Sequence, residues 1–342
     1  MRAFIEVSNV AKELGLTRKA RWFYVLLLAV LTLALAGAIA GFVLLGDSWF
    51  QLLIAAALGV IITQFAFVGH EAEHNQVLNT TENNNKLARI LAVGVVGLSL
   101  SWWTNKHSRH HGNPNRVGKD PDIERDTISF LEEDAASSRG LVRWINQRQG
   151  WLFIPLLMLE GANLYQHSLR HVCGRGPVTR RWTEIALLVT HFAVLLVPVF
   201  VMLPLGMAFA FVGVHLAVFG LYMGGAFAPN HTGMPIVDKK AKLDFFSKHV
   251  RTSRNIKGGW WAAILMGGLN YQIEHHLFPT MPRPHLGRVR TIVKEYCETH
   301  NVPYTETTLL QSYVVVIKYL NKVGLAARDP FACPINAQFR RV

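Results

Sequence analysis

The sequence predicts an all-α integral membrane protein, with four transmembrane helices in two hairpins and a cytoplasmic helical cap. Three observations predict this fold class: 51% of the residues are hydrophobic, four long stretches carry no charge, and all 35 Lys and Arg residues lie outside those stretches. An uncharged helix of about 20 residues is about 30 Å long, which matches the hydrocarbon core of a bilayer. This pattern argues against an ordinary soluble protein.

The uncharged stretches occur in pairs. Asp47 and Ser48 separate the first two, and Pro204 breaks the second two, so each pair is expected to form a hairpin. The predicted transmembrane helices cover residues 23–46, 49–69, 185–203 and 205–228.

Two hairpins return the chain to the side it left. The N-terminal segment 1–22, the cap segments 70–184 and 229–310 and the tail 311–342 should therefore share one side, with 23–310 as the membrane domain. The positive-inside rule places that side, and both termini, in the cytoplasm. The net charge of +13 is then concentrated on one face, where it either attracts anionic lipid headgroups or an anionic substrate carrier, or is only a topology signal. We expect no nucleic acid partner.

Two further apolar stretches, 87–103 and 151–165, are too short or too interrupted to span a bilayer comfortably, and we expect interfacial or re-entrant helices there. Residues rich in Pro, Gly, Asn and Asp predict loops at 113–122, 228–235 and 278–284. These elements adjoin clusters of histidines.

Seven of the 15 histidines fall in three short motifs. Within each motif the spacing is i, i+3 or i+4, which places the side chains on one face of a helix. The motifs are His70 with His74, His107 with His110 and His111, and His275 with His276, the last preceded by Gln272 at the corresponding first position.

An eighth histidine, His231, lies just after the last span of the second hairpin, as His70 lies just after the last span of the first. Neutral imidazoles suit zinc, copper and iron, and seven or eight exceed the needs of one ion, so we predict a two-metal site with open positions. Any one histidine alone is better explained as an ordinary hydrogen-bonded side chain. His249, His285 and His300 belong to no motif, and we expect them at the surface.

Polar neighbours of the motifs can orient the imidazole rings by accepting the second ring N–H. The candidates for this role are Gln272, Glu71, Asp120, Asp122 and Glu274.

Three segments resemble a known family, the membrane-bound fatty acid desaturases, and within it the branch of front-end desaturases and their bacterial relatives. Residues 102–111 (WWTNKHSRHH), with PN at 114–115 and DPDI at 120–123, resemble the second histidine box of that branch. Residues 267–279 (GGLNYQIEHHLFP) resemble its third box, including the glutamine, and RTSRN at 251–255 resembles a segment upstream. The likeness extends over roughly residues 20 to 310.

The resemblance implies four membrane helices under a cap that binds two iron ions, with O2 as co-substrate and a fatty-acyl chain (acyl-CoA or acyl-lipid) receiving a cis double bond. The implied iron ligands are His70, His74, His107, His110, His111, His231, His275 and His276. Only about 22 residues precede the first span, so no fused haem domain is expected. Electrons should come from a separate ferredoxin or cytochrome with its reductase, and we expect a bacterial cell membrane as the location.

An apolar tunnel must select the acyl carbons that react. The aromatic candidates for its wall are Trp102, Trp103, Trp260, Trp261 and Tyr271, with an interfacial aromatic belt as the alternative. Arg251, Arg254 and Lys257 are candidates to bind an anionic carrier head, with topology or helix packing as the alternative.

Removing two hydrogens from an unactivated methylene chain requires a redox cofactor, which side chains alone cannot replace. Two other functions remain open at this stage. One is hydroxylation of an acyl, sphingolipid or carotenoid substrate at the same metals, and the other is a metal transporter or sensor without turnover.

Overall fold

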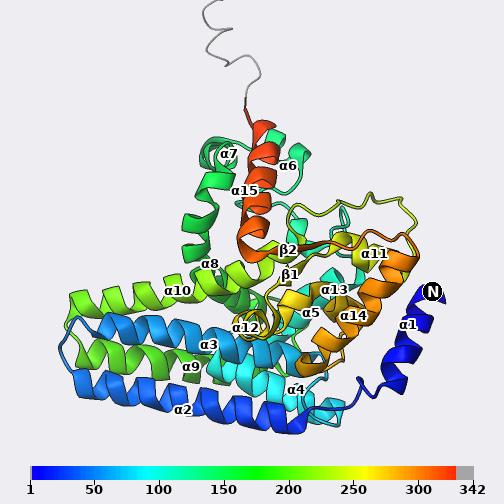
Figure 1. Ribbon diagram of the computed structural model, residues 1–342. Helices are drawn as coiled ribbons and strands as arrows, with labels where there is room; N and C mark the ends of the chain where they lie inside the picture. Colours follow the sequence, from blue (N-terminus) through cyan, green and yellow to red (C-terminus); the bar gives the residue numbers. More distant parts are fainter. Residues whose placement is uncertain (1, 329–342) are drawn as a thin grey trace, which may run out of the picture.

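The computed structural model describes residues 2–328, which are mainly helical (Figure 1). The helices are α1 (Arg2–Glu13), α2 (Arg21–Leu45), α3 (Gln51–Glu73), α4 (Thr81–Arg89), η1 (Ile90–Val95), α5 (Leu100–Gly112), η2 (Pro121–Ile123), α6 (Glu132–Ser137), α7 (Gly140–Asn146), α8 (Gln149–Cys173), α9 (Arg181–Met202), α10 (Leu205–His231), α11 (Phe245–Thr252), α12 (Gly259–Leu265), η3 (Leu269–Tyr271), α13 (Gln272–Leu277), α14 (Arg283–Thr299) and α15 (Leu309–Leu325). Two short strands, β1 (Asn255–Lys257) and β2 (Glu306–Thr308), pair in parallel.

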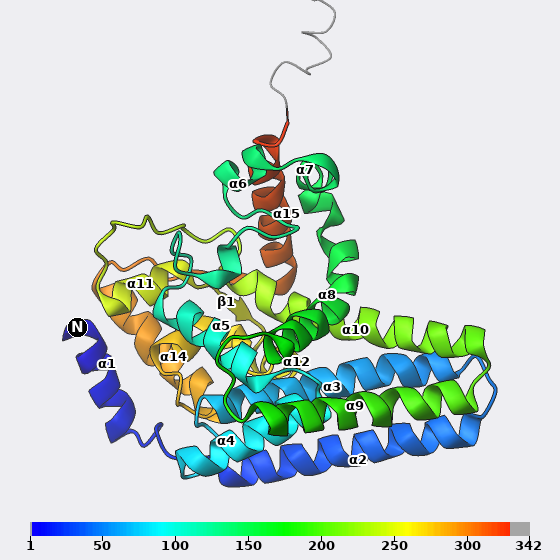
Figure 2. The same ribbon diagram turned by 180° about the vertical axis from the view of Figure 1, so that it is seen from behind.

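Four helices, α2, α3, α9 and α10, are long and apolar enough to cross a membrane. They match the four predicted spans, with bounds that differ by a few residues, and form two hairpins that lie side by side (Figures 1 and 2). Apolar side chains cover the outside of the bundle: Leu33 is 73% exposed and Val201 is 77% exposed, as expected for surfaces that contact lipid. The predicted membrane fold class is confirmed.

The other described residues gather toward one end of these four helices and form a cap (Figure 2). The predicted re-entrant stretch 87–103 is a bent pair, in which the helix Thr81–Val95 meets α5 at 115°. The sharp change of direction follows Gly97, whose φ of 83° is open to glycine but strained for other residues. The bend turns α5 and its histidines toward the bundle.

The second predicted interfacial stretch, 151–165, lies inside the longer helix α8, which crosses α10 closely. Two glycines permit the crossing. A Cβ added at Gly220 would lie 2.3 Å from the backbone nitrogen of Gly161, and a Cβ at Gly161 would lie 2.5 Å from the carbonyl oxygen of Leu216. Small residues at a crossing allow two helical backbones to approach, which fixes α10 against the cap.

The helices α1 and α15 both pack on the cap. Val7 and Ala11 of α1 are buried within the same apolar cluster as Val293 of α14. Residues 311–325, which the sequence suggested for a tail, belong to α15, where Val316 and Leu320 are fully buried against α8. The packing surface of the cap thus continues through α15, past the expected boundary at residue 310, which stays a prediction. The last part of the expected tail, 329–342, lies outside the described residues.

Candidate metal centre

The first two histidines lie at the cap end of α3. The helix ends at His74, and Asn75, with φ of 59°, turns the chain away. One helical turn separates His70 from His74, so their rings lie on the same face with centroids 4.7 Å apart. His70 is 5% exposed.

Three more histidines come from α5. Ser99 caps this helix by accepting a hydrogen bond from the Trp102 backbone nitrogen. The i, i+3, i+4 spacing then directs all three rings of α5 toward the bundle, as the sequence predicted, and His107 and His110 are buried.

The third motif forms the short helix α13, in which every residue is buried. Two glycines in left-handed conformation, Gly267 and Gly268, lead into it. A Cβ at Gly267 would lie 2.3 Å from the Phe67 ring of α3, so only glycine lets this turn press against the membrane bundle. That contact brings His275 and His276 over the other motifs.

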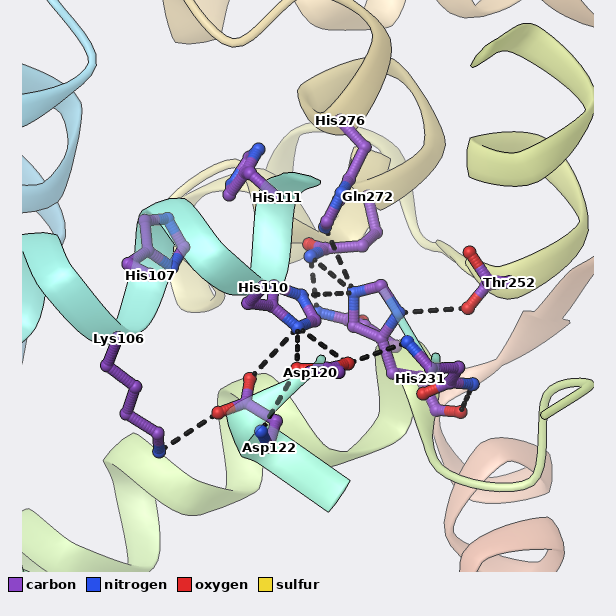
Figure 3. Close-up of polar contacts among 12 residues, drawn as sticks. Lys106, His107, His110, His111, Asp120, Asp122, His231, Thr252, Gln272 and His276 are labelled. Carbon is purple, nitrogen blue, oxygen red and sulfur yellow. Dashed lines mark hydrogen bonds and ion pairs between the residues drawn. The ribbon is translucent and has the colours of Figure 1, made fainter. Parts of the chain in front are cut away.

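His231 is the last residue of α10, and its orientation is fixed. Its Nδ1 donates a hydrogen bond to the Thr252 carbonyl oxygen at 2.9 Å, which leaves Nε2 unprotonated in the neutral ring. This Nε2 lies 3.3 Å from Nε2 of His110 and 3.1 Å from Nε2 of His276 (Figure 3).

The eight histidines form two groups, each with ligand atoms within 4.8 Å of one another. The five-histidine group consists of His70, His74, His107, His111 and His275, and the three-histidine group consists of His110, His231 and His276. All eight predicted ligands are thus brought together, from four separate helices.

The donor atoms within the groups fit metal ions. Two imidazole nitrogens that bind one ion at about 2.0–2.1 Å lie roughly 2.8–3.4 Å apart, from a right-angled to a tetrahedral arrangement. The Nε2 atoms of His74 and His107 are 2.8 Å apart, those of His70 and His107 are 2.9 Å apart, and those of His111 and His275 are 3.1 Å apart. Hydrogen bonds alone could not satisfy so many convergent nitrogen atoms, whereas a cation between them would.

The protonation states agree with this fit. Burial lowers the pKa of His74 to about 3, and burial followed by neighbouring histidines lowers the pKa of His107, His111 and His275 well below the ordinary value. These rings are therefore neutral at pH 7, with a lone pair free to bind a metal.

His110 has a different environment. Its Nδ1 lies 3.0 Å from Asp120 Oδ1 and 3.2 Å from Asp122 Oδ2, and Asp122 in turn pairs with Lys106 at 2.9 Å (Figure 3). Burial acts to lower the pKa of His110, but the two carboxylates outweigh burial and raise it. A ring that donates its Nδ1–H to a carboxylate is held in place and becomes a stronger ligand through Nε2.

The other polar candidates fall into two kinds, one beside an imidazole and two that pair with other groups. The Gln272 amide nitrogen lies 3.0 Å from Nε2 of His231, beside the three-histidine group. Glu71 and Glu274, in contrast, contact no imidazole. Glu71 forms a buried ion pair with Arg283 at 2.5 Å, and Glu274 accepts hydrogen bonds from Asn255 and Tyr304. These two carboxylates connect α3 to α14 and α13 to its surroundings.

A small apolar pocket adjoins the five-histidine group. His70 and Trp103 form part of its wall, together with Phe67, Leu100, Met223 and Phe227. The Trp103 ring stacks on His107 with centroids 4.8 Å apart, so the pocket reaches the rings of the five-histidine group. Trp103 is the predicted aromatic residue that the structure brings to this pocket.

The remaining aromatic candidates lie elsewhere. Trp102 stacks on His167, Trp260 and Trp261 are 77% and 43% exposed, and Tyr271 packs into the apolar cluster around α14. The exposed tryptophans of α12 fit the interfacial alternative better than a tunnel wall.

Of the basic candidates, Arg251 and Lys257 are exposed, but Arg254 is only 2% exposed. Its guanidinium donates to the carbonyl oxygens of Pro229 and Thr232, on either side of His231. Arg254 therefore cannot reach a carrier head as expected, and instead holds the end of α10 that presents His231.

The sequence interpretation missed His249. It was expected at the surface, yet it is 1% exposed and its ring centroid lies 5.4 Å from that of His276. The amphipathic pattern of residues 245–252, which buries Phe246, His249 and Val250, was a local signal for its burial.

A family model described as "Fatty acid desaturase" matches residues 47–308. Among curated proteins, the chain is 30% identical over 320 residues to "Delta(8)-fatty-acid desaturase 2" of Arabidopsis thaliana. The aligned region covers 86% of this chain and 68% of that protein. It is 26% identical to "Delta(8)-fatty-acid desaturase" of Helianthus annuus, over 96% of this chain and 74% of the relative. It is 28% identical to "Acyl-lipid (9-3)-desaturase" of Physcomitrium patens, over 81% of this chain and 54% of the relative.

Proposed function

Since the chain belongs to the fatty acid desaturase family, we propose that it introduces a cis double bond into a fatty-acyl chain at two iron ions, with O2 and a separate electron donor. The observation that carries this proposal is the pair of histidine groups beside an apolar pocket. The acyl chain is carried as acyl-CoA or acyl-lipid, and the name of the Physcomitrium patens relative favours an acyl-lipid.

The five-histidine group would hold one iron, and the three-histidine group with Gln272 beside it would hold the other. Bound iron would supply the redox chemistry, since O2 accepts two electrons from the acyl chain and two from the donor. The balance is one –CH2–CH2– unit, one O2, two electrons and two protons converted to one –CH=CH– unit and two waters. Asp120 and the Thr252 carbonyl hold the rings of His110 and His231 in their binding orientation.

The pocket would position the substrate. Its wall is apolar apart from His70, so it excludes water and favours a methylene chain over a charged group. Trp103 packs on His107 and limits how far the chain can shift at the reacting carbons. The pocket therefore suits methylene groups of an acyl chain beside the five-histidine group.

The positive-inside rule supports placing the cap and both termini in the cytoplasm. The 35 basic residues avoid the spans and the turns of both hairpins. The relatives named above are plant proteins, so a bacterial cell membrane stays a prediction.

Expression in a host with a matching electron donor, followed by mass spectrometry of membrane fatty acids, tests the proposal. We expect a new double bond with the unmodified chain and none with His107→Ala. Chelation should abolish the activity of purified protein, and ferrous iron, unlike zinc, should restore it. A hydroxylated product would favour the hydroxylase alternative, and bound metal without any oxidised lipid would favour a transporter or sensor.

A further inference from the structure

We propose that a basic patch on the cap docks a small acidic one-electron carrier protein, and that His249 links this docking surface to the three-histidine group. The inference rests on the proposed function, which requires two electrons for each double bond and therefore two encounters with a one-electron carrier. The basic patch consists of Arg116, Lys119, Lys239, Lys240, Lys242 and Lys248.

The patch is assembled from two loops and α11. The loop after α5 and the loop before α11 lie side by side. The backbones of Arg116 and Val237 form an isolated β-bridge, and the Arg116 guanidinium donates a hydrogen bond to the carbonyl oxygen of Lys239 at 2.8 Å. The Lys239 side chain lies across Gly118, where an added Cβ would be 2.9 Å away. Lys248 Nζ donates to the Gly112 carbonyl oxygen at 2.6 Å, one residue after His111.

The positive charge of the patch is not neutralised within residues 2–328. None of its six side chains forms an ion pair there. The two nearby carboxylates are engaged with backbone nitrogens: Asp238 accepts from Lys240 at 2.8 Å, and Asp244 accepts from Ser247 at 3.2 Å as the cap of α11. Six positive against two negative charges leave a field that attracts an acidic surface.

One residue separates this surface from a predicted metal ligand. The His249 ring lies 5.4 Å from His276 on one side and 4.4 Å from Phe245 on the other, measured between centroids, and Phe245 is 37% exposed. Both ring nitrogens of His249 are buried without a hydrogen-bond partner, which is costly unless the position serves a purpose. Because electron transfer weakens steeply with distance, a carrier over Phe245 would occupy a favourable position.

The location favours a soluble protein over lipid headgroups. Helix α11 and the loop before it lie beyond the cap-side ends of the four spanning helices in both views of the fold (Figures 1 and 2). The apolar pocket instead lies between α3, η1, α5 and α10, beside the other histidine group. A carrier at the patch would therefore leave the pocket free, and electron-transfer complexes need only a small interface.

The test uses the purified, iron-loaded full chain with a bound acyl substrate and two reductants. One is a reduced acidic carrier, either a plant-type [2Fe–2S] ferredoxin or an acidic haem domain, whichever supports turnover. The other is dithionite with methyl viologen, which needs no docking. The variant Lys240→Glu/Lys242→Glu is compared with Lys318→Glu/Lys322→Glu, which makes the same charge change on exposed residues of α15.

We expect the patch variant to lower kcat/KM for the carrier by about 10-fold or more at low salt, through KM, and to weaken its salt dependence. Its rate with methyl viologen and its KM for the acyl substrate should match those of the control. Equal carrier KM values in the two variants would overturn the inference. A higher KM for the acyl substrate in the patch variant alone would overturn it in favour of an acyl-carrier site.

His249 is tested with His249→Leu and His249→Phe. We expect His249→Leu to have a lower kcat with the carrier, while its KM for the carrier and its iron content stay unchanged. His249→Phe should retain most of that kcat. Loss of iron from His249→Leu would overturn the linking role and make His249 a support for the metal. If the unmodified chain forms no double bond with either reductant, the proposed function fails, whatever the variants do.

Discussion

The two histidine groups are built on different principles. The five-histidine group is almost purely imidazole, lies against the apolar pocket through His70, and contains rings made neutral by burial. The three-histidine group has fewer imidazoles but more polar support: Asp120 and Asp122 contact His110, and Gln272 contacts His231. One group adjoins the apolar pocket and the other has polar neighbours in the cap, so equal substitutions in the two groups should have unequal effects.

The largest effect is expected at the shared ring of the five-histidine group. His107 has Nε2 within 2.9 Å of two other histidine nitrogens, so His107→Ala removes a central ligand. We expect loss of desaturation beyond the ~10–100-fold typical of losing an outer partner, together with loss of bound iron. Metal analysis and product analysis check this. The matched control, His300→Ala, alters an exposed histidine and should retain both.

The next effect concerns how the five-histidine group is anchored. Arg283→Met leaves Glu71 buried without its partner at the end of α3, which should destabilise the protein by about 3–5 kcal/mol. The double variant Arg283→Met/Glu71→Gln should recover part of that loss, because it removes the unpaired charge. Thermal unfolding in detergent measures both. A single variant as stable as the unmodified chain would mean that the ion pair does not hold α3 to α14.

A smaller effect is expected from the polar support of the three-histidine group. Asp120→Asn removes the charged acceptor that holds the His110 ring, and metal affinity should fall by about 10–100-fold. Competition with a chelator gives the affinity. The exposed Asp126→Asn serves as the control and should change nothing. If Asp120→Asn loses iron to the chelator no faster than the control does, the Asp120 carboxylate does not strengthen metal binding by His110.

The smallest effect is expected at Gln272. Its amide lies beside Nε2 of His231 but is a weak ligand, so Gln272→Ala should lower metal affinity by less than ~10-fold. Gln272→His, which offers an imidazole at the same position, should bind iron at least as tightly as the unmodified chain. A loss from Gln272→Ala larger than that from Asp120→Asn would make the amide a principal ligand and reverse this ranking.

The sequence predicted what depends on local patterns. Uncharged stretches identified the four spans, and helical spacing identified seven of the histidines, since both signals lie within a few neighbouring residues. The partners of Glu71 and Arg254 could not be predicted in this way. Glu71 meets Arg283, which is 212 positions away in the chain, and Arg254 reaches backbone carbonyls that have no signature in the sequence.

Burial explains the other differences. His249 belongs to no motif, and its place beside His276 depends on how α11 packs against α13. Residues 311–325 have an ordinary amphipathic pattern, and only the folded chain shows that α8 covers Val316 and Leu320. Contacts of this kind arise only from the tertiary structure.

The position of α13 in the chain also sets the timing of assembly. It supplies His275 to one group and His276 to the other, about 200 residues after His70. During synthesis, neither group is complete until both hairpins have been made and α13 has left the ribosome. Metal loading is then a final step of biogenesis, and a chain interrupted before α13 would leave the ribosome with its membrane helices made and both metal-binding groups unfinished.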